Sequence, residues 1–321
     1  MIRGDGPRAG DVWDGYGETL TGAVSTGDWI ASVRTVTTRT ARVRCVDVPH
    51  ENGPTIVLLH GISASWKWFV HLFPALSQRY RILAVDLPGF GGSSFSRYHV
   101  TVDRLADAVV DVCDALDVEA PVVLGHSMGS MVATRVAVRH PDRLGSLIIT
   151  GGPILSLVHL IRQPVETFRR NPRAVATLVA ESAVVGLPLP QPVASLIAGS
   201  VRLRRVALGA FVARPDLLDP DVVRATMQDL GAPATFPVLA STVTGDPGRE
   251  LEKVRCPTRI LRGAEDALSP RDDVALFLSR VPTADEVRFD HTGHWPHIER
   301  PRRFVEEVHR FVSPGVAPME L

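Results

Sequence analysis

Short apolar runs of strand length alternate with helix-length amphipathic stretches along most of this 321-residue chain. Several runs, such as TIVLLH, are apolar at nearly every position, which is typical of strands covered on both faces. Strands that alternate with helices predict right-handed crossovers and a mostly parallel sheet. The predicted strands are residues 55–60, 80–86, 121–126, 143–150, 257–263 and 285–290, and the predicted helices are residues 101–117, 128–140, 271–281 and 301–312.

Two segments depart from this alternation. Residues 33–48 alternate apolar and polar side chains, which predicts an antiparallel pair of strands. Residues 151–245 contain three apolar helical stretches separated by prolines, at about 154–170, 173–186 and 192–213. We interpret this second segment as a helical insertion between two strands of the sheet.

The predicted domain organisation follows from these patterns. The glycine-rich residues 1–30 form an N-terminal extension that is expected to be loosely ordered, although it contains aromatic residues. Residues 31–150 and 246–313 form an α/β core, and residues 151–245 form the inserted helical cap.

Composition excludes several classes of protein. The 35 basic and 35 acidic residues balance, so the chain lacks the general basic field that a nucleic-acid partner would require. Cys45, Cys113 and Cys256 match neither a metal-ligand spacing nor a disulfide framework, which favours a reducing compartment. No signal-peptide pattern opens the chain, and no apolar run reaches the roughly 18 residues of a membrane span. We therefore expect a cytoplasmic protein without a membrane span.

A serine lies between two glycines where the strand at 121–126 gives way to the helix at 128–140. The motif is GHSMG, with Ser127 at its centre and glycine at positions 125 and 129. Ligand sites of parallel sheets lie at the carboxyl ends of the strands, and the glycines allow a sharp turn that exposes the hydroxyl. The flanking strand and helix favour a reactive Ser127 over an ordinary turn serine.

A serine hydroxyl needs a base to activate it, and the base needs an orienting acid. In this type of fold both follow the serine, in the order acid and then histidine. Glu265 and Asp266 follow one later strand, and three histidines at positions 291, 294 and 297 follow another. We select Asp266 and His294, with Glu265 as the alternative acid.

The spacing of the three histidines also raises the possibility of a metal site. Gly293 and Pro296 interrupt any helix that would align them, and no thiolate or carboxylate cluster accompanies them. We therefore predict no metal, and interpret His291 and His297 as hydrogen-bonded loop residues. His60 is expected to hold its loop, and His126 to pack beside the sheet.

Five motifs in order resemble the α/β-hydrolase superfamily, in its Ser-His-Asp esterase and haloperoxidase-like branch with a helical cap. The motifs are LLHGISAS (58–65), DLPGFGGS (86–93), GHSMG (125–129), GAEDALSP (263–270) and GHWPHIERP (293–301). The resemblance covers nearly all of the chain from residue 33 onward. It implies an α/β-hydrolase fold with nucleophile Ser127, acid Asp266 and base His294. It also implies an oxyanion hole made by the backbone N–H groups of Ile62 and Met128, and no cofactor.

Aromatic and apolar residues adjoin the predicted catalytic groups. Trp66, Trp68 and Phe69 follow the oxyanion loop, and Trp295 follows the predicted base. They predict an apolar substrate pocket, in which we place Trp66 and Trp295. The arginines at 202, 204 and 205 could bind an anionic group, but such a run is more often a solvated helix face, and we leave them outside the site.

The function that the sequence favours is cofactor-free hydrolysis of an ester, lactone or thioester of a small apolar molecule. Carbon–carbon bond hydrolysis and perhydrolysis on the same triad remain alternatives, as does a non-hydrolytic binding or biosynthetic protein. Epoxide hydrolases and haloalkane dehalogenases of this fold carry Asp at the position of Ser127, which makes both activities improbable. The oligomeric state is left open.

Overall fold

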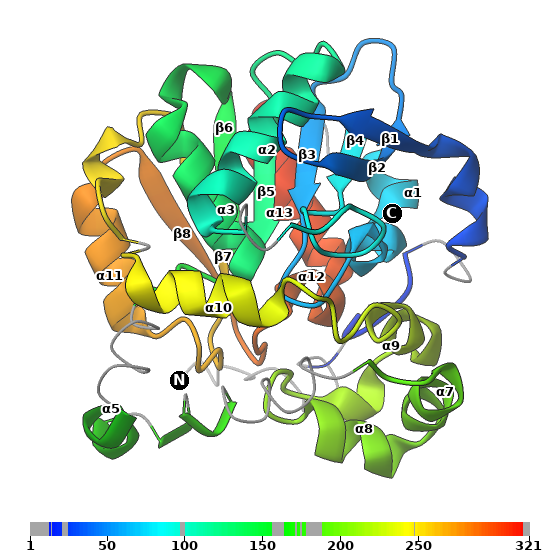
Figure 1. Cartoon of the computed structure of the whole chain (residues 1–321). Helices are drawn as coiled ribbons and strands as arrows, with labels where there is room; N and C mark the ends of the chain where they lie inside the picture. The colour runs from blue at the N-terminus through cyan, green and yellow to red at the C-terminus, as the bar shows by residue number, and fades with distance from the viewer. Residues whose placement is uncertain are drawn as a thin grey trace, which may run out of the picture.

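The described strands form one mixed sheet with helices around it, as Figure 1 shows. The computed structural model describes residues 13, 15–20, 25–96, 100–155, 164–170, 172–173, 175–177, 188–246 and 248–316. The strand order among these residues is β1-β2-β4-β3-β5-β6-β7-β8. The strands are β1 (Val33–Thr37), β2 (Arg42–Val48), β3 (Thr55–Leu59), β4 (Arg81–Val85), β5 (Val122–His126), β6 (Ser146–Thr150), β7 (Thr258–Gly263) and β8 (Ala284–Phe289).

The direction of the strands confirms the predicted fold class. β2 pairs antiparallel with both β1 and β4, whereas all pairs from β4 to β8 are parallel. The predicted antiparallel pair at residues 33–48 is therefore confirmed as β1 and β2. The parallel strands all end at the same edge, so residues that follow them are brought together there.

Helices cover both faces of the sheet. Successive side chains of a strand point to opposite faces, and in β3 Ile56 and Leu58 belong to one apolar core while Val57 and Leu59 belong to the other. The first core includes residues of η3 and α13, and the second includes residues of α2, α3 and α11. These elements are η3 (Trp66–Leu72), α1 (Phe73–Leu76), α2 (Val102–Ala115), α3 (Met128–Arg139), α11 (Arg271–Arg280), α12 (Pro296–Glu299) and α13 (Pro301–Val312).

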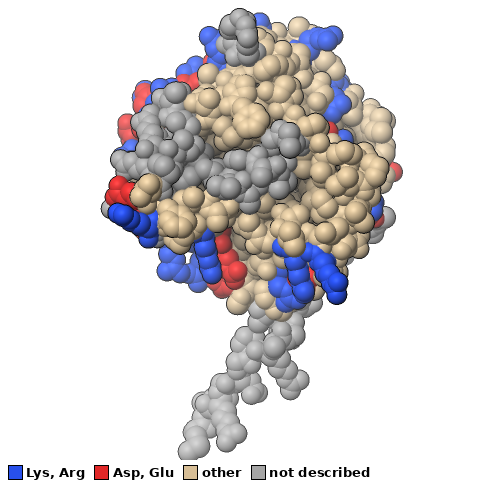
Figure 2. Space-filling model, turned by 60° about the horizontal axis from the view of Figure 1, so that its bottom comes forward, with Lys and Arg blue, Asp and Glu red and all other residues tan. Residues whose placement is uncertain are grey.

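The chain between β6 and β7 forms further helices, which lie beyond one end of the sheet in Figure 1. Figure 2 shows this end of the molecule, where uncharged residues cover much of the described surface and Lys and Arg side chains gather along its edge. The helices are α5 (Pro164–Arg170), α7 (Gln191–Gly199), α8 (Val201–Leu208), α9 (Pro220–Thr226) and α10 (Thr235–Thr244).

The predicted helical stretches differ from these helices in three respects. The stretch at 192–213 is two helices, because Ser200 has an extended backbone and its hydroxyl caps α8 by accepting from the Leu203 N–H. Helices α9 and α10 were not predicted, although Asp219 followed by Pro220 is an N-cap signal. Most of the predicted stretch at 173–186 lies outside the described residues.

Part of the predicted N-terminal extension packs against the core. Tyr16 and Leu20 are both buried, and both belong to the apolar core that includes α13. The expectation of loose order therefore does not hold for these two residues. Residues 1–12, 14 and 21–24 lie outside the described part of the chain.

The cysteines and the helices bear on the predicted compartment. Cys45, Cys113 and Cys256 are all buried and free. Among the described residues, no helix combines the length and apolar character that crossing a membrane requires.

Candidate active site

Ser127 lies on a strained turn between β5 and α3. Its φ of 53° and ψ of −118° are unfavourable for a residue with a side chain. The flanking glycines are required by close approach, since a Cβ at Gly125 would lie 2.1 Å from the Gly129 carbonyl oxygen, and one at Gly129 would lie 2.2 Å from the Leu59 oxygen. The turn therefore holds the serine hydroxyl at the edge where the parallel strands end.

This close packing gives a stability prediction. Gly125→Ala is expected to lower the free energy of unfolding by about 3 kcal/mol, because the added methyl group overlaps the backbone at Gly129. Urea denaturation measures the change. Gly199→Ala is the matched control, since no atom lies within 4 Å of a Cβ there, and it should leave stability unchanged or slightly raised. Equal stability of the two variants would contradict the proposed close approach.

Hydrogen bonds join the three predicted triad side chains. The Ser127 Oγ lies 3.0 Å from His294 Nε2, and His294 Nδ1 lies 2.9 Å from Asp266 Oδ2. All three residues are buried. Asp266 Oδ1 accepts from the N–H groups of Leu268 and Ser269 at 2.9 and 3.2 Å, so both carboxylate oxygens are engaged. The geometry fits an Nδ1–H that donates to Asp266, with Nε2 as the acceptor for the serine proton.

The alternative acid, Glu265, lies outside this arrangement. Its side chain is 51% exposed, whereas that of Asp266 is 0% exposed. The partner of Glu265 is His291, with 3.8 Å between Oε1 and Nδ1. The structure therefore brings Asp266, and not its neighbour, to His294.

A narrow cavity of about 50 Å³ lies over Ser127 and His294. Gly61 and Ile62 form part of its wall, and a Cβ at Gly61 would lie 3.4 Å from the Ser127 Cβ. Met128 is the first residue of α3, where backbone N–H groups have no acceptor within the helix. The cavity is lined by Gly61, Ile62, Trp68, His126, Ser127, Leu208, Phe211, Thr226, Met227, Leu230, His294 and Trp295.

The two tryptophans that we predicted for the pocket differ in their position relative to this cavity. Trp295 lines the cavity and stacks on Phe211, with 5.7 Å between the ring centroids. Trp66, which we also predicted for the pocket, is not among the residues that line this cavity. Its ring packs against Phe73 instead, at 6.1 Å, and Trp68 lines the cavity in its place.

His126 does more than pack beside the sheet. Its Nδ1 accepts from Trp68 Nε1 at 3.0 Å, which leaves a proton on Nε2 that donates to the His294 carbonyl at 3.1 Å. Burial lowers the pKa of His126 well below its usual value, and the neighbouring His294 acts in the same direction. His126 is therefore a neutral donor to the backbone of the predicted base. The variable middle position of the motif gave no signal of this role.

The other histidines have different environments. His60 Nε2 accepts from the Leu87 N–H at 3.0 Å, which fits the expected loop-holding role. His291 is exposed. His297 is fully buried, and neither ring nitrogen has a hydrogen-bond partner among the described residues. The prediction of a hydrogen-bonded His297 is therefore wrong for its side chain.

Buried neutral histidines predict acid sensitivity. Burial lowers the pKa of His71 from 6.5 to about 4, although its Nε2 donates to the His297 carbonyl. Between these values the unfolded chain binds a proton that the folded chain does not. The free energy of unfolding should therefore fall by about 3 kcal/mol as the pH falls through this window.

Melting temperature measured from pH 7.5 to 4 tests this expectation. His71→Gln should reduce the pH dependence, because glutamine does not titrate, while the other buried histidines keep the remainder. His291→Gln is the control at an exposed position, and it should keep the wild-type slope. An unchanged slope in His71→Gln would remove His71 as a cause of acid sensitivity.

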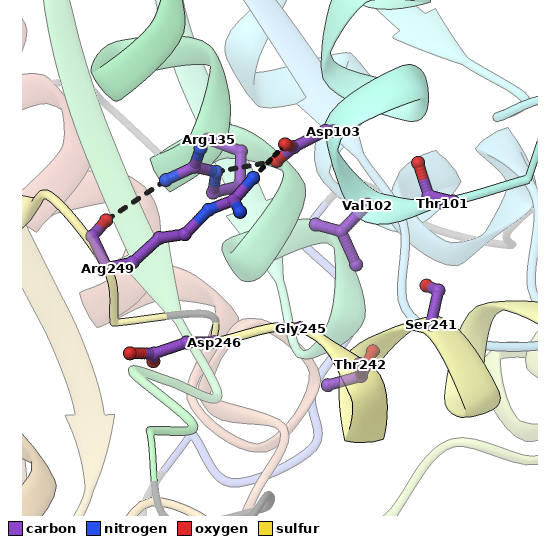
Figure 3. Close-up of a pocket in the computed structure, with 9 residues that line it drawn as sticks. All are labelled: Thr101, Val102, Asp103, Arg135, Ser241, Thr242, Gly245, Asp246 and Arg249. Atoms are coloured by element: carbon purple, nitrogen blue, oxygen red, sulfur yellow. Dashed lines mark hydrogen bonds and ion pairs between the residues drawn. The ribbon is translucent and has the colours of Figure 1, made fainter.

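A larger cavity lies elsewhere, between α2, α3 and α10 (Figure 3). It has a volume of about 250 Å³, and none of the three triad residues lines it. Asp103 accepts from Arg135 Nε at 2.7 Å and pairs with Arg249, while Arg135 also donates to the Arg249 carbonyl at 3.0 Å. These three residues come from α2, α3 and the chain after α10, so their contacts join these elements.

The arginine run of α8 does not line the cavity over Ser127. Arg204 is buried and donates to the carbonyl groups of Ala198, Pro215 and Asp216. Arg205 pairs with the Asp216 carboxylate at 3.1 Å. Both therefore support the loop after α8.

Comparison with known proteins gives one family. The model of the alpha/beta hydrolase fold matches residues 54–301. The chain is 29% identical over 270 residues to a pimeloyl-[acyl-carrier protein] methyl ester esterase of Aeromonas hydrophila, covering 81% of this chain and 96% of that protein. It is also 29% identical over 284 residues to a 2-hydroxy-6-oxononadienedioate/2-hydroxy-6-oxononatrienedioate hydrolase of Cupriavidus pinatubonensis, covering 85% and 91%.

A solved structure supports the same fold. The crystal structure of E-2-(acetamidomethylene)succinate hydrolase superposes with a TM-score of 0.69 at 19% identity. The match covers 87% of this chain and 98% of that one.

Proposed function

The chain belongs to the alpha/beta-hydrolase family and is a hydrolase, and on this basis we propose that it cleaves a carboxylic ester, lactone or thioester of a small apolar molecule. The reaction proceeds through an acyl-enzyme on Ser127 and uses no cofactor. The observation that carries the proposal is the buried chain of hydrogen bonds from Ser127 through His294 to Asp266.

Each triad residue has a distinct role in this proposal. His294 Nε2 takes the Ser127 proton as Oγ attacks the carbonyl carbon, and then gives that proton to the departing alcohol. Asp266 keeps the imidazole in the required tautomer and stabilises the imidazolium. In deacylation, His294 takes a proton from water as the water oxygen attacks the acyl carbon. The bond from that carbon to Ser127 Oγ then breaks, His294 returns the proton to Oγ, and the acid leaves.

The negative charge of the tetrahedral intermediate needs hydrogen-bond donors. We assign this role to the backbone N–H groups of Ile62 and Met128, which flank Ser127 from the loop after β3 and from the start of α3. A donor of this kind can contribute about 3 kcal/mol to transition-state stabilisation.

The wall of the cavity supports an apolar substrate. Leu208, Phe211, Met227 and Leu230 line it, and all four come from residues 151–245, which supports a cap that excludes water. Among the described residues, no Lys or Arg lines this cavity. A carboxylate on the substrate would therefore be buried without a counter-charge, which is costly.

Two esters with the same leaving group test the proposal. We expect kcat/KM for p-nitrophenyl butyrate to exceed that for p-nitrophenyl succinate by about 30-fold or more, because burying an unpaired carboxylate costs about 2 kcal/mol or more. Each added methylene should raise kcat/KM by up to about fourfold until the cavity is filled. Preference for the succinate ester would contradict the apolar assignment.

Carbon–carbon bond hydrolysis is the second candidate, because the similar protein of Cupriavidus pinatubonensis is named for a dienedioate hydrolase. That substrate carries two carboxylates, which the described lining does not match. A 2-hydroxy-6-oxo-dienoate assayed beside the esters separates the two reactions. Faster turnover of the dienoate would replace the ester proposal.

Two further measurements distinguish perhydrolysis and a non-hydrolytic role from ester hydrolysis. Perhydrolysis would require peroxide to compete with water for the acyl-enzyme, which is measured as peracid formed from the same esters. A folded wild-type protein that a fluorophosphonate probe does not label would point to a binding protein, because an activated Ser127 would react with the probe.

A further inference from the structure

The buried carboxylate of Glu299 joins three segments that are far apart in the sequence. Glu299 is the last residue of α12 and is fully buried. One donor comes from the N-terminal segment, one from the chain after α8, and two from the residues on either side of His294. These donors are Tyr16 Oη at 2.5 Å, the Ala213 N–H at 2.9 Å, the Gly293 N–H at 2.9 Å and the Trp295 N–H at 3.1 Å.

The peptide groups around His294 are held from outside their own loop. The His294 N–H donates to the Phe211 carbonyl at 2.6 Å, and the His294 carbonyl accepts from His126 Nε2 at 3.1 Å. The preceding and following N–H groups both donate to Glu299. The position of the imidazole therefore depends on Glu299, on His126 and on the chain after α8.

Tyr16 connects Glu299 to the chain after α8. Its hydroxyl donates to Glu299 and accepts from the Arg214 N–H at 2.8 Å, while the Gly17 N–H donates to the Glu299 carbonyl at 2.9 Å. The Arg300 guanidinium lies 4.9 Å from the centre of the Tyr16 ring. Burial raises the pKa of Glu299, and the hydrogen bond from Tyr16 opposes that rise. The phenol thus compensates part of the cost of a buried carboxylate.

We propose that Glu299 and Tyr16 are positioning residues, which hold the His294 loop so that the imidazole stays within hydrogen-bond distance of Ser127. The inference rests on the proposed function and deepens it. It also gives the N-terminal segment, which lies outside the matched residues 54–301, a part in the reaction. A base must lie within about 3.2 Å of the proton that it takes, and a displacement of 1 Å can cost about 100-fold in rate.

Tyr16→Phe tests the proposal, with Tyr80→Phe as the matched control. Each variant removes one buried hydroxyl. The Tyr80 hydroxyl lies 2.6 Å from His309 Nδ1, and Tyr80 does not line the cavity over Ser127. For p-nitrophenyl butyrate we expect Tyr16→Phe to lower kcat about tenfold with KM changed less than about twofold. Tyr80→Phe should lower the melting temperature by a similar amount and leave kcat unchanged.

Glu299→Gln is a second variant with a larger expected effect. Its side-chain NH₂ would replace one of two acceptor oxygens and would meet backbone N–H donors. We expect kcat to fall about 100-fold. Tyr16→Phe keeps the proposal testable if Glu299→Gln does not fold.

The downfield proton NMR signal of the His294 Nδ1–H···Asp266 hydrogen bond is a readout that needs no substrate. It should broaden or disappear in Tyr16→Phe and persist in Tyr80→Phe. Wild-type kcat and a wild-type signal in Tyr16→Phe would overturn the proposal, as would an equal loss in both variants. If the wild-type protein cleaves no ester but the signal still responds selectively to Tyr16→Phe, the proposed function fails and the positioning role stands.

Discussion

Replacing Ser127 by alanine is expected to lower kcat for ester hydrolysis by about 10⁵-fold and to abolish labelling by a fluorophosphonate. Without Oγ no acyl-enzyme can form, and only the oxyanion donors and the binding cavity remain to accelerate attack by water. Steady-state kinetics measures the first effect, and intact-protein mass spectrometry measures the second.

Ser279→Ala is the control for this variant. Ser279 belongs to α11, and its exposed hydroxyl donates to the Leu276 carbonyl at 2.7 Å. It should keep wild-type activity and labelling. Circular dichroism should show both variants folded. Wild-type turnover by Ser127→Ala would mean that another group is the nucleophile.

Replacing Asp266 by asparagine is expected to lower kcat by about 10⁴-fold. The asparagine amide can present its NH₂ to His294 Nδ1, which favours the tautomer with the proton on Nε2. That tautomer cannot accept the Ser127 proton. KM should change little, because Asp266 does not line the cavity over Ser127.

Glu265→Gln is the matched control at the adjacent position. The half-exposed Glu265 side chain pairs with His291 and not with His294, so this variant should keep kcat within about twofold of wild type. A large loss of kcat in Glu265→Gln, with little loss of kcat in Asp266→Asn, would show that Glu265 is the acid. Both kinetic measurements use the same p-nitrophenyl ester.

The order of strands and helices could be predicted because the patterns that specify them are local. Side chains that face the same side recur at every second residue along a half-buried strand and at every third or fourth residue along a helix. The motif around Ser127 could also be recognised in the sequence, because the close approach of the backbone at this turn requires its glycines. The division of residues 192–213 into α7 and α8 was not predicted, because one capping hydroxyl, that of Ser200, interrupts an apolar run that otherwise continues.

The residues that line the pocket could not be predicted from local sequence patterns. Trp66 and Trp68 are both aromatic and both buried, yet only the second contacts the cavity. They belong to the 3₁₀ helix η3, in which residues two apart point in different directions. Nothing local distinguishes the ring that packs on Phe73 from the ring that meets His126.

Local patterns were enough to predict the fold class and the candidate reactive groups, because strand and helix periodicity and a glycine-bounded serine are specified within a few residues. Which side chains come into contact depends on the packing of the whole fold. Ser127 and His294 are 167 residues apart, and Tyr16 and Glu299 are 283 apart. Such contacts depend on how whole elements pack against one another, and that packing is a property of the complete core.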